Sequence, residues 1–242
     1  MATFIILAAG NGTRMNTDLP KVLVDVNGKA MIERILENCE SLASRIILVV
    51  SPTNKDQIQT YLTSKNFVSL EFVTQELQLG TGHAVQSCMS ILSEKDEQII
   101  ILNGDMPLIQ KELLYDFINY PTPCIATTKL ASPTGYGRII TVNGKMIGIV
   151  EEKDCNVFEK AILEVNVGMY MFSYDILLKY IFDLKNNNKQ NEYYLPDLVR
   201  LCINNCININ RYVVPMNKQH QVKGVNTKIE LEEVETLLKY YH

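Results

Sequence analysis

Two glycines and two cations follow the first apolar segment of the chain. Gly10 and Gly12 lie in the sequence GNGTRM, and Arg14 and Lys21 lie in and just beyond it. Glycine leaves backbone N–H groups open to close approach by oxyanions. A guanidinium binds phosphate oxygens as a planar fork, and an ammonium acts as a compact point charge. An ordinary glycine turn beside solvated cations is the alternative. The preceding strand and the two cations favour a site for a nucleoside triphosphate that loses pyrophosphate.

A carboxylate lies at the end of a second apolar segment. Asp105 stands in the sequence LNGDMPL, directly after the apolar run QIIIL. A residue in this position can equally be a turn residue or a helix cap. Mg²⁺, however, needs hard oxygen ligands and usually takes only one or two from protein. Ligands of open α/β sheets bind beyond the carboxyl ends of the strands, so we expect Asp105 and the loop 10–14 to face one crevice.

A second glycine-rich turn follows two glutamines. Gln75 and Gln78 precede it in the sequence QELQLGTGHA, and Gly80 and Thr81 open the helical pattern that comes next. Amide side chains both donate and accept hydrogen bonds, which suits the edge of a uracil ring. Gly80 and Thr81 offer further contacts to a base or ribose. A plain helix start capped by Thr81 is the alternative, and His83 is predicted to pack or cap, not to catalyse.

One glycine and three polar residues stand out in the second half of the chain. Gly137 lies in a glycine-containing bend, PTGYGRI, and Asn166 lies within a strand pattern, EVNVG, where asparagine is disfavoured. An amide in such a place indicates a polar ligand. Glu151, in IVEEKD, could bind sugar hydroxyls or be an ordinary solvated carboxylate. Asn226, in VKGVN, would by itself be only the cap of the helix that follows.

The composition excludes several classes of protein. The chain has 242 residues, 47% of them hydrophobic, and a net charge of −4. This hydrophobic content predicts a folded core. The acidic balance argues against binding to nucleic acid or to an anionic membrane, so a phosphate ligand needs local cations. No apolar run reaches the roughly 18 to 20 residues that span a bilayer, and we expect a cytoplasmic protein.

Cysteine and histidine are too scattered for a transition-metal site. There are six cysteines without a CxxC pair and three histidines, two of them late in the chain. We therefore expect thiols packed in the core and no transition metal. The cysteines are Cys39, Cys88, Cys124, Cys155, Cys202 and Cys206.

Strand and helix patterns alternate through the first half, which predicts a mostly parallel sheet. The run QIIIL is apolar throughout, as expected of a strand buried on both faces. The expected strands are 3–9, 45–50, 70–74 and 98–102, and the expected helices are 30–42, 55–64 and 80–92.

The second half changes character. RIITVNGKMIGIVEE reads as two strands joined by an Asn143-Gly144 turn, and we expect this hairpin to form a lobe over the site. The chain should close with an amphipathic helix, 228–241, whose apolar side comprises Ile229, Leu231, Val234, Leu237 and Leu238. The other expected elements are a strand at 164–172, helices at 174–183 and 195–204, and a polar loop at 185–190.

Eight short motifs occur in one order across nearly the whole chain. They are LAAGNGTRM with LPK downstream, QELQLGTGHA, LNGDMPL, PTGYGRI, IVEEKD, EVNVG, NEYYLPDL and VKGVN. Together they strongly resemble the uridyltransferase domain of bacterial N-acetylglucosamine-1-phosphate uridyltransferases. The resemblance implies a Rossmann-like nucleotidyltransferase fold of the α/β class. It also implies a Mg²⁺-dependent reaction in which UTP and N-acetylglucosamine 1-phosphate give UDP-N-acetylglucosamine and pyrophosphate.

The same resemblance implies roles for individual residues. Arg14 and Lys21 would be catalytic, neutralising the triphosphate and the charge that grows at the α-phosphorus. The residues expected to bind the nucleotide are Leu7, Ala8, Ala9, Gly10, Gly12, Gln75, Gln78, Gly80 and Thr81. The residues expected to bind the sugar are Asn103, Gly104, Gly137, Glu151 and Asn166, and those expected to hold Mg²⁺ are Asp105 and Asn226.

The chain departs from the family pattern in three ways. Bacterial members usually continue into a left-handed β-helix that uses acetyl-CoA and forms the trimer, whereas this sequence stops at His242. We expect no acetyltransferase activity and no CoA binding, and the oligomeric state stays open. Asn103 replaces a common tyrosine and Val167 a common threonine, which leaves the fine sugar selectivity open.

Other functions fit the sequence less well. Another sugar-1-phosphate nucleotidyltransferase, using glucose 1-phosphate or dTTP, is the nearest alternative. A dinucleotide-dependent oxidoreductase is disfavoured because Met15 stands at the third glycine position of GxGxxG and no acidic residue ends the strand 45–50. A Walker-type ATPase would need GK[ST] after the loop. A silent nucleotide-sugar-binding protein would not need Arg14, Lys21, Asp105 and Asn226 together.

We expect one domain over residues 1–242. Within it, 1–110 should form the nucleotide-binding half, 111–226 the sugar-binding part and 227–242 a closing helix. The expected partners are the two substrates, UTP and N-acetylglucosamine 1-phosphate, with neither nucleic acid nor membrane.

Overall fold

A computed structural model gives the fold for residues 1–10, 12, 15, 17 and 19–241. Nine strands of these residues form one sheet, with the order β11-β7-β10-β6-β1-β4-β5 and with β8 and β9 attached through β10. Strand β1 (Ala2–Leu7) lies between β4 (Ala43–Val50) and β6 (Ile99–Asn103) and runs parallel to both. The expectation of an α/β protein with a mostly parallel sheet is confirmed for this half.

The direction of the strands changes at β10 (Glu164–Phe172), which runs antiparallel to both β6 and β7 (Cys124–Lys129). The described part of the chain therefore has a mixed sheet. The carboxyl ends of β1 and β6 emerge on one edge, where Leu7 lies opposite Asn103 in the register. This edge is where an open α/β sheet binds ligands.

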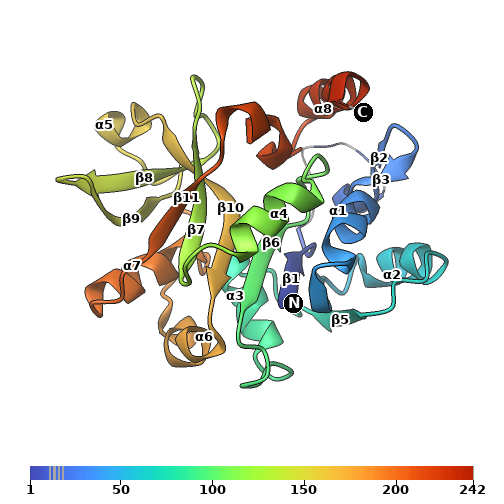
Figure 1. Cartoon of the computed structure of the whole chain (residues 1–242), viewed down its shortest axis with the longest axis horizontal. Coiled ribbons are helices and arrows are strands. Elements are labelled where there is room, and N and C mark those ends of the chain that lie inside the picture. The colour runs from blue at the N-terminus through green and yellow to red at the C-terminus, as the bar shows by residue number, and fades with distance from the viewer. Residues whose placement is uncertain (11, 13–14, 16, 18, 242) are drawn as a thin grey trace.

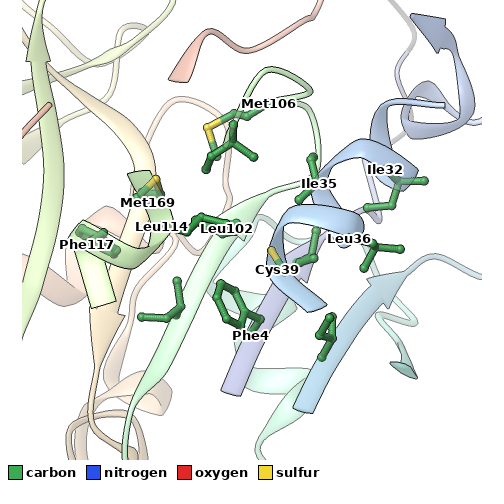
Figure 2. Close-up of a cluster of buried hydrophobic side chains, with 14 of the residues drawn as sticks. Phe4, Ile32, Ile35, Leu36, Cys39, Leu102, Met106, Leu114, Phe117 and Met169 are labelled. Atoms are coloured by element: carbon green, nitrogen blue, oxygen red, sulfur yellow. The ribbon is translucent and has the colours of Figure 1, made fainter. Parts of the chain in front are cut away.

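Alternate residues of the central strands build a core on each face of the sheet. Phe4 and Leu102 pack on one face, against α1 (Met31–Glu40) and α4 (Lys111–Ile118), as Figure 2 shows. Ile5 and its neighbours pack on the other face, against α3, α6 and α7. Because the central strands are covered on both faces, almost every residue of QIIIL must be apolar, as observed. Figure 1 shows this three-layer arrangement.

The hairpin lobe extends from the antiparallel side of the sheet (Figure 1). Strands β8 (Gly137–Val142) and β9 (Lys145–Val150) pair antiparallel, and β8 also pairs with β10. Asn143 has φ of 51° and Gly144 has φ of 76°, as a type I′ turn requires at its two central positions. The predicted hairpin is confirmed, with the turn where the sequence placed it.

A third apolar cluster anchors the carboxyl-terminal helix. Helix α8 (Lys228–Tyr241) has the predicted bounds, and its Val234 and Leu238 pack with Met15 and Val225. Ile229, predicted on the apolar side, is instead 70% exposed. The helical period places all five predicted apolar residues on one side of α8. The surface of α8 that packs against the rest of the protein is narrower than that side.

Most predicted elements are present within a few residues of their expected ends. Six helices and strands were not predicted, namely β2, β3, α4, β7, α5 and β11. Five of the six cysteines are buried, as expected, and Cys206 is exposed. Within the described residues no helix has the length and apolar character needed to cross a membrane. The remaining elements are β2 (Asp25–Val26), β3 (Lys29–Ala30), α2 (Lys55–Thr63), β5 (Leu70–Thr74), α3 (Thr81–Cys88), α5 (Val157–Lys160), α6 (Tyr174–Tyr180), α7 (Pro196–Asn204) and β11 (Asn210–Val213).

Candidate active site

Two neighbouring cavities open at the carboxyl ends of the central strands. The first, called here the strand-end cavity, has a volume of about 390 Å³ and is lined by Leu7, Ala8, Ala9, Gly10, Lys21, Val22, Gln75, Gln78, Gly80, Thr81, Ala84, Asn103, Gly104, Asp105 and Glu192. The second, the lobe cavity, has a volume of about 280 Å³ and lies towards the hairpin lobe. Its walls include Gly137, Glu151, Asn166, Tyr170 and Tyr194. Both cavities are lined by Thr81, Asn103, Asp105 and Glu192.

Hydrogen bonds fix the backbone that follows β1. The carbonyl of Leu7 accepts from Gly104 N at 2.9 Å, and the carbonyl of Ala8 accepts from Asn54 Nδ2 at 2.9 Å. The Gln78 side-chain amide donates to the carbonyl of Ala9. A Cβ on Gly104 would lie 2.8 Å from the Leu7 carbonyl oxygen, so only glycine lets β1 and β6 approach this closely. The floor of the strand-end cavity is therefore rigid backbone.

Lys21 joins the two predicted metal ligands. Its ammonium Nζ lies 2.6 Å from Asp105 Oδ2 and 2.8 Å from Asn226 Oδ1. The Lys21 and Asp105 side chains are 15% and 17% exposed, so this ion pair is largely shielded from solvent. Lys21 lines the strand-end cavity, Asn226 lines the lobe cavity, and Asp105 lines both. The three residues meet where the cavities meet.

The backbone explains how Asn226 reaches Asp105, 121 positions earlier in the chain. Val225 N donates to the Asp105 carbonyl at 2.9 Å, which holds the two segments side by side. Thr227 then caps α8, because its Oγ1 accepts from Glu230 N at 3.2 Å. Asn226 is thus not the cap, and its side-chain oxygen is directed to Lys21 instead.

The donor set suits a hard divalent cation. Asp105 offers a carboxylate and Asn226 an amide carbonyl, and both oxygens already converge on one positive charge, the Lys21 ammonium. Two oxygen ligands from protein are the usual number for Mg²⁺ bound together with phosphates. Among the described residues no cluster of three or more His, Cys, Asp or Glu side chains could hold a metal. Asp105 and Asn226 thus form a pair of oxygen donors that could hold Mg²⁺ beside phosphate.

The second glycine-rich turn is fastened to a segment that precedes α7. Gly82 N donates to the Tyr193 carbonyl at 2.7 Å, and Tyr193 N donates to the Leu79 carbonyl at 2.7 Å. Thr81 Oγ1 accepts from Leu195 N at 3.0 Å, so its side chain links the two segments and does not cap α3. This contact brings Glu192 into the walls of both cavities.

Glu151 lies in a group of carboxylates in the lobe cavity. Burial, together with the nearby charges of Asp197, Asp154 and Glu192, raises the pKa of Glu151 to about 7. Arg138 opposes this rise but is bound elsewhere, since its guanidinium is 2.6 Å from Glu152. A Cβ on Gly137 would lie 2.9 Å from Glu151 Oε1, so Gly137 leaves the space that the carboxyl group occupies.

Asn166 is held by its own strand. Its Nδ2 donates to Tyr170 Oη at 2.6 Å, and its Oδ1 accepts from Gly168 N at 3.3 Å, across the irregularity in the β10 register. Burial raises the pKa of the Tyr170 hydroxyl above its usual range. Asn103 packs over Gly168, where an added Cβ would lie 2.1 Å from the Asn103 amide nitrogen. The polar wall of the lobe cavity is thus preorganised.

Most of the residues singled out in the sequence lie at these cavities. Gly104, expected near a sugar, lines only the strand-end cavity, and Gly12 packs beside Lys21 without lining either cavity. Arg14 lies outside the described residues. Sequence reasoning missed Glu192, Tyr194 and Tyr170 as wall residues. The first two belong to the NEYYLPDL motif, and Tyr170 stands four residues after Asn166.

The amino-terminal half matches a described family. Residues 4–135 match the MobA-like NTP transferase domain, which covers more than half of the chain. This chain belongs to that family. It is accordingly a nucleotidyltransferase, with the glycine-containing loop, Lys21 and Asp105 all inside the matched segment.

Relatives match over nearly the whole chain. A protein of Acanthamoeba polyphaga mimivirus named "Probable UDP-N-acetylglucosamine pyrophosphorylase" is 39% identical over 97% of this chain and 95% of its own length. "Bifunctional protein GlmU" of Desulfotalea psychrophila is 39% identical over 94% of this chain and 67% of its own length. The chain spans only half the length of the protein of that name from Francisella tularensis, at 37% identity. A solved structure of UDP-glucose pyrophosphorylase with UDP-glucose superposes on all of this chain, with a TM-score of 0.76 and 19% identity, and so confirms the fold.

Proposed function

We propose that this nucleotidyltransferase transfers UMP from UTP to N-acetylglucosamine 1-phosphate, giving UDP-N-acetylglucosamine and pyrophosphate. The observation that carries the proposal is the meeting of Lys21, Asp105 and Asn226 at the junction of the two cavities. A group transferred from a nucleotide in one cavity to a sugar phosphate in the other must pass this junction. The names of the full-length relatives supply the substrates.

The strand-end cavity suits the nucleotide. Its floor is backbone from Leu7 to Gly10, and its side walls carry the amides of Gln75 and Gln78. Amide groups match the hydrogen-bonding edge of a base without adding charge. The triphosphate would extend towards Lys21, with Arg14 as the second cation.

The lobe cavity suits the sugar. Glu151, Asn166 and Tyr194 present oxygen and nitrogen atoms to a space of about 280 Å³. Because hydroxyl groups both donate and accept, a carboxyl group and an amide together satisfy several of them. The phosphate of the sugar would lie at Asp105 and Asn226, which line the mouth shared with the other cavity.

The reaction needs positioning and electrostatic stabilisation more than a nucleophilic side chain. A phosphate oxygen of the sugar phosphate attacks the α-phosphorus of UTP, the bond to the β-phosphate oxygen breaks, and pyrophosphate leaves with the electron pair. The ammonium of Lys21 stabilises the oxygens that gain charge, as preorganised donors do in other transfers. Mg²⁺ held by Asp105 and Asn226 would supply Lewis-acid stabilisation of the same phosphate oxygens.

Glucose 1-phosphate is the competing acceptor, since the superposable solved structure is a UDP-glucose pyrophosphorylase. That structure is too distant in sequence to decide between sugars. dTTP is the competing donor, because it presents the same hydrogen-bonding edge as UTP.

Pyrophosphate release tests the proposal. UTP with N-acetylglucosamine 1-phosphate should give Mg²⁺-dependent release that exceeds release with glucose 1-phosphate or dTTP. Asp105→Asn should lower kcat/KM by about 10²-fold or more, the scale for loss of one preorganised electrostatic group. Asp116→Asn is the matched control, because Asp116 also pairs with a lysine, Lys218, but away from both cavities. Faster release with glucose 1-phosphate, or equal effects of the two variants, would contradict the proposal.

A further inference from the structure

The Gln75 side chain is held on two sides in the wall of the strand-end cavity. The residue is 3% exposed, and its Nε2 lies 3.0 Å from the Gly80 carbonyl oxygen and 3.1 Å from His83 Nδ1. For Oε1 of the same amide, no hydrogen bond is found among the described residues. Oε1 is therefore the amide atom left to meet a ligand in the cavity.

The neighbours of the Gln75 amide determine which of its two terminal atoms is the nitrogen and which is the oxygen. A carbonyl oxygen only accepts, so the amide atom facing Gly80 must be the NH₂ group. The second hydrogen of that group points to His83, and His83 Nδ1 must then be an acceptor. A reversed amide would place two acceptors against each other at Gly80, which leaves a buried polar group without its hydrogen bond.

The proton of the neutral His83 ring is consequently on Nε2. Burial lowers the pKa of His83, and a hydrogen bond with the backbone of Leu77 opposes that effect. Because the Gln75 amide faces Nδ1 with its NH₂ group, this one contact fixes the ring tautomer.

We propose that His83 is a positioning residue that sets the base specificity of the strand-end cavity through Gln75. With Nδ1 as a fixed acceptor, Gln75 presents Oε1 to the ligand and so requires a hydrogen-bond donor opposite it, which we place at position 3 of the pyrimidine ring. Uracil carries such a donor at N3, whereas N3 of cytosine is an unprotonated acceptor. The inference depends on the proposed function in one respect, that this cavity holds the pyrimidine of the nucleotide.

Discrimination of this kind is strong because a mismatch leaves buried polar groups unpaired. Cytosine could be accepted only after rotation of the Gln75 amide, which His83 and Gly80 both oppose. Removing the acceptor at position 83 leaves Gly80 alone to hold the amide. The discrimination between UTP and CTP should then fall by about tenfold, the effect of one hydrogen bond.

Two substitutions at position 83 separate positioning from packing. His83→Leu removes the acceptor, and His83→Asn restores one near the place of Nδ1. The ratio of kcat/KM for UTP to that for CTP should fall about tenfold in H83L and recover most of its value in H83N. Ser87→Ala is the matched control on the same helix, because Ser87 Oγ bonds the His83 carbonyl and not its ring. It should leave the ratio unchanged.

The wild-type protein offers a second test that needs no variant. Two-dimensional ¹⁵N NMR of the His83 ring should report a protonated Nε2 and an unprotonated Nδ1. A proton on Nδ1, or a UTP-to-CTP ratio unchanged in folded H83L, would overturn the inference. Failure of the proposed function has a different signature, namely a wild-type protein that releases no pyrophosphate from UTP with any sugar phosphate.

Discussion

The two cavities use different chemistry at the ends of neighbouring strands. Apart from Asp105 and Glu192, which line both cavities, the strand-end cavity is built mainly from backbone atoms and neutral side chains, with Lys21 as its described cation. The lobe cavity gathers carboxyl groups, and burial and mutual repulsion raise the pKa of Glu151 within it. This contrast favours our assignment of the nucleoside triphosphate to the first cavity and of the hydroxyl-rich sugar to the second.

Among the substitutions that test this comparison, removal of a cation expected at the strand-end cavity should have the largest effect on turnover. We propose that Arg14 neutralises charge on the transferred phosphoryl group, so Arg14→Ala is expected to lower turnover about 10² to 10³-fold, the scale for loss of one electrostatic group. Arg45→Ala is the control, since Arg45 pairs with Glu71 away from both cavities. Steady-state pyrophosphate release measures both variants. Unchanged turnover in R14A would remove Arg14 from the mechanism.

The carboxyl groups of the lobe cavity should make the free energy of unfolding depend on pH. The pKa of Glu151 is raised to about 7 in the folded protein, so the folded state retains a proton that the unfolded state releases near pH 4.5. The folded protein therefore loses stability relative to the unfolded chain as the pH rises from about 4.5 to about 7.

Glu151→Gln removes this penalty because glutamine does not ionise. Relative to wild type, E151Q should gain roughly 2 to 3 kcal/mol of unfolding free energy between pH 5 and pH 8. Urea denaturation at each pH measures the gain, with the exposed Glu76→Gln as control. A gap between E151Q and wild type that stays constant with pH would show that Glu151 titrates normally.

The smallest effects come from a matched pair of glycines, one in each region. Gly12 and Gly144 have φ of 58° and 76°, so alanine should cost about 1 to 2 kcal/mol of backbone strain at either position. A Cβ at position 12 would also lie 2.6 Å from Lys21 Cβ, whereas one at position 144 would meet nothing within 4 Å.

Both alanine variants should therefore lose stability, but only Gly12→Ala should also lose activity. Thermal denaturation and pyrophosphate release, measured on the same preparations, separate the two effects. If G144A lowered kcat/KM as much as G12A does, the hairpin turn would be coupled to the reaction and the separation of the two regions would be wrong.

The parts of the fold that follow from local pattern could be predicted. The run QIIIL indicates a strand buried on both faces, and Asn143-Gly144 indicates a type I′ turn, because each feature depends on a few adjacent residues. Strands β7 and β11 lack such a signal, and their apolar residues are explained only by the sheet they join, with β11 paired to β7 more than 80 positions away. Helix α4 does carry a local signal that sequence reasoning missed, because its buried Leu113, Leu114 and Phe117 have the spacing of one helix face.

The candidate site shows the same limit. The sequence indicated the chemistry of Lys21, Asp105 and Asn226 but not their mutual contacts, which need the bond between Val225 and the Asp105 carbonyl. The sequence also allowed Thr81 to be a helix cap, whereas in the structure the Thr81 hydroxyl oxygen accepts a hydrogen bond from Leu195 N. Contacts between distant segments have no counterpart in motif spacing.

The cluster that anchors α8 links the two ends of the polypeptide. Met15, from the glycine-containing loop, shares this cluster with Val225, Val234 and Leu238. Among the described residues of α8, only Glu230 in its first turn lines either cavity, yet the cluster joins the helix to Met15 and to Val225, the neighbour of Asn226. We expect removal of residues from 234 onwards to take a common support from both segments and so to weaken ligand binding, although none of the described residues in that stretch lines either cavity.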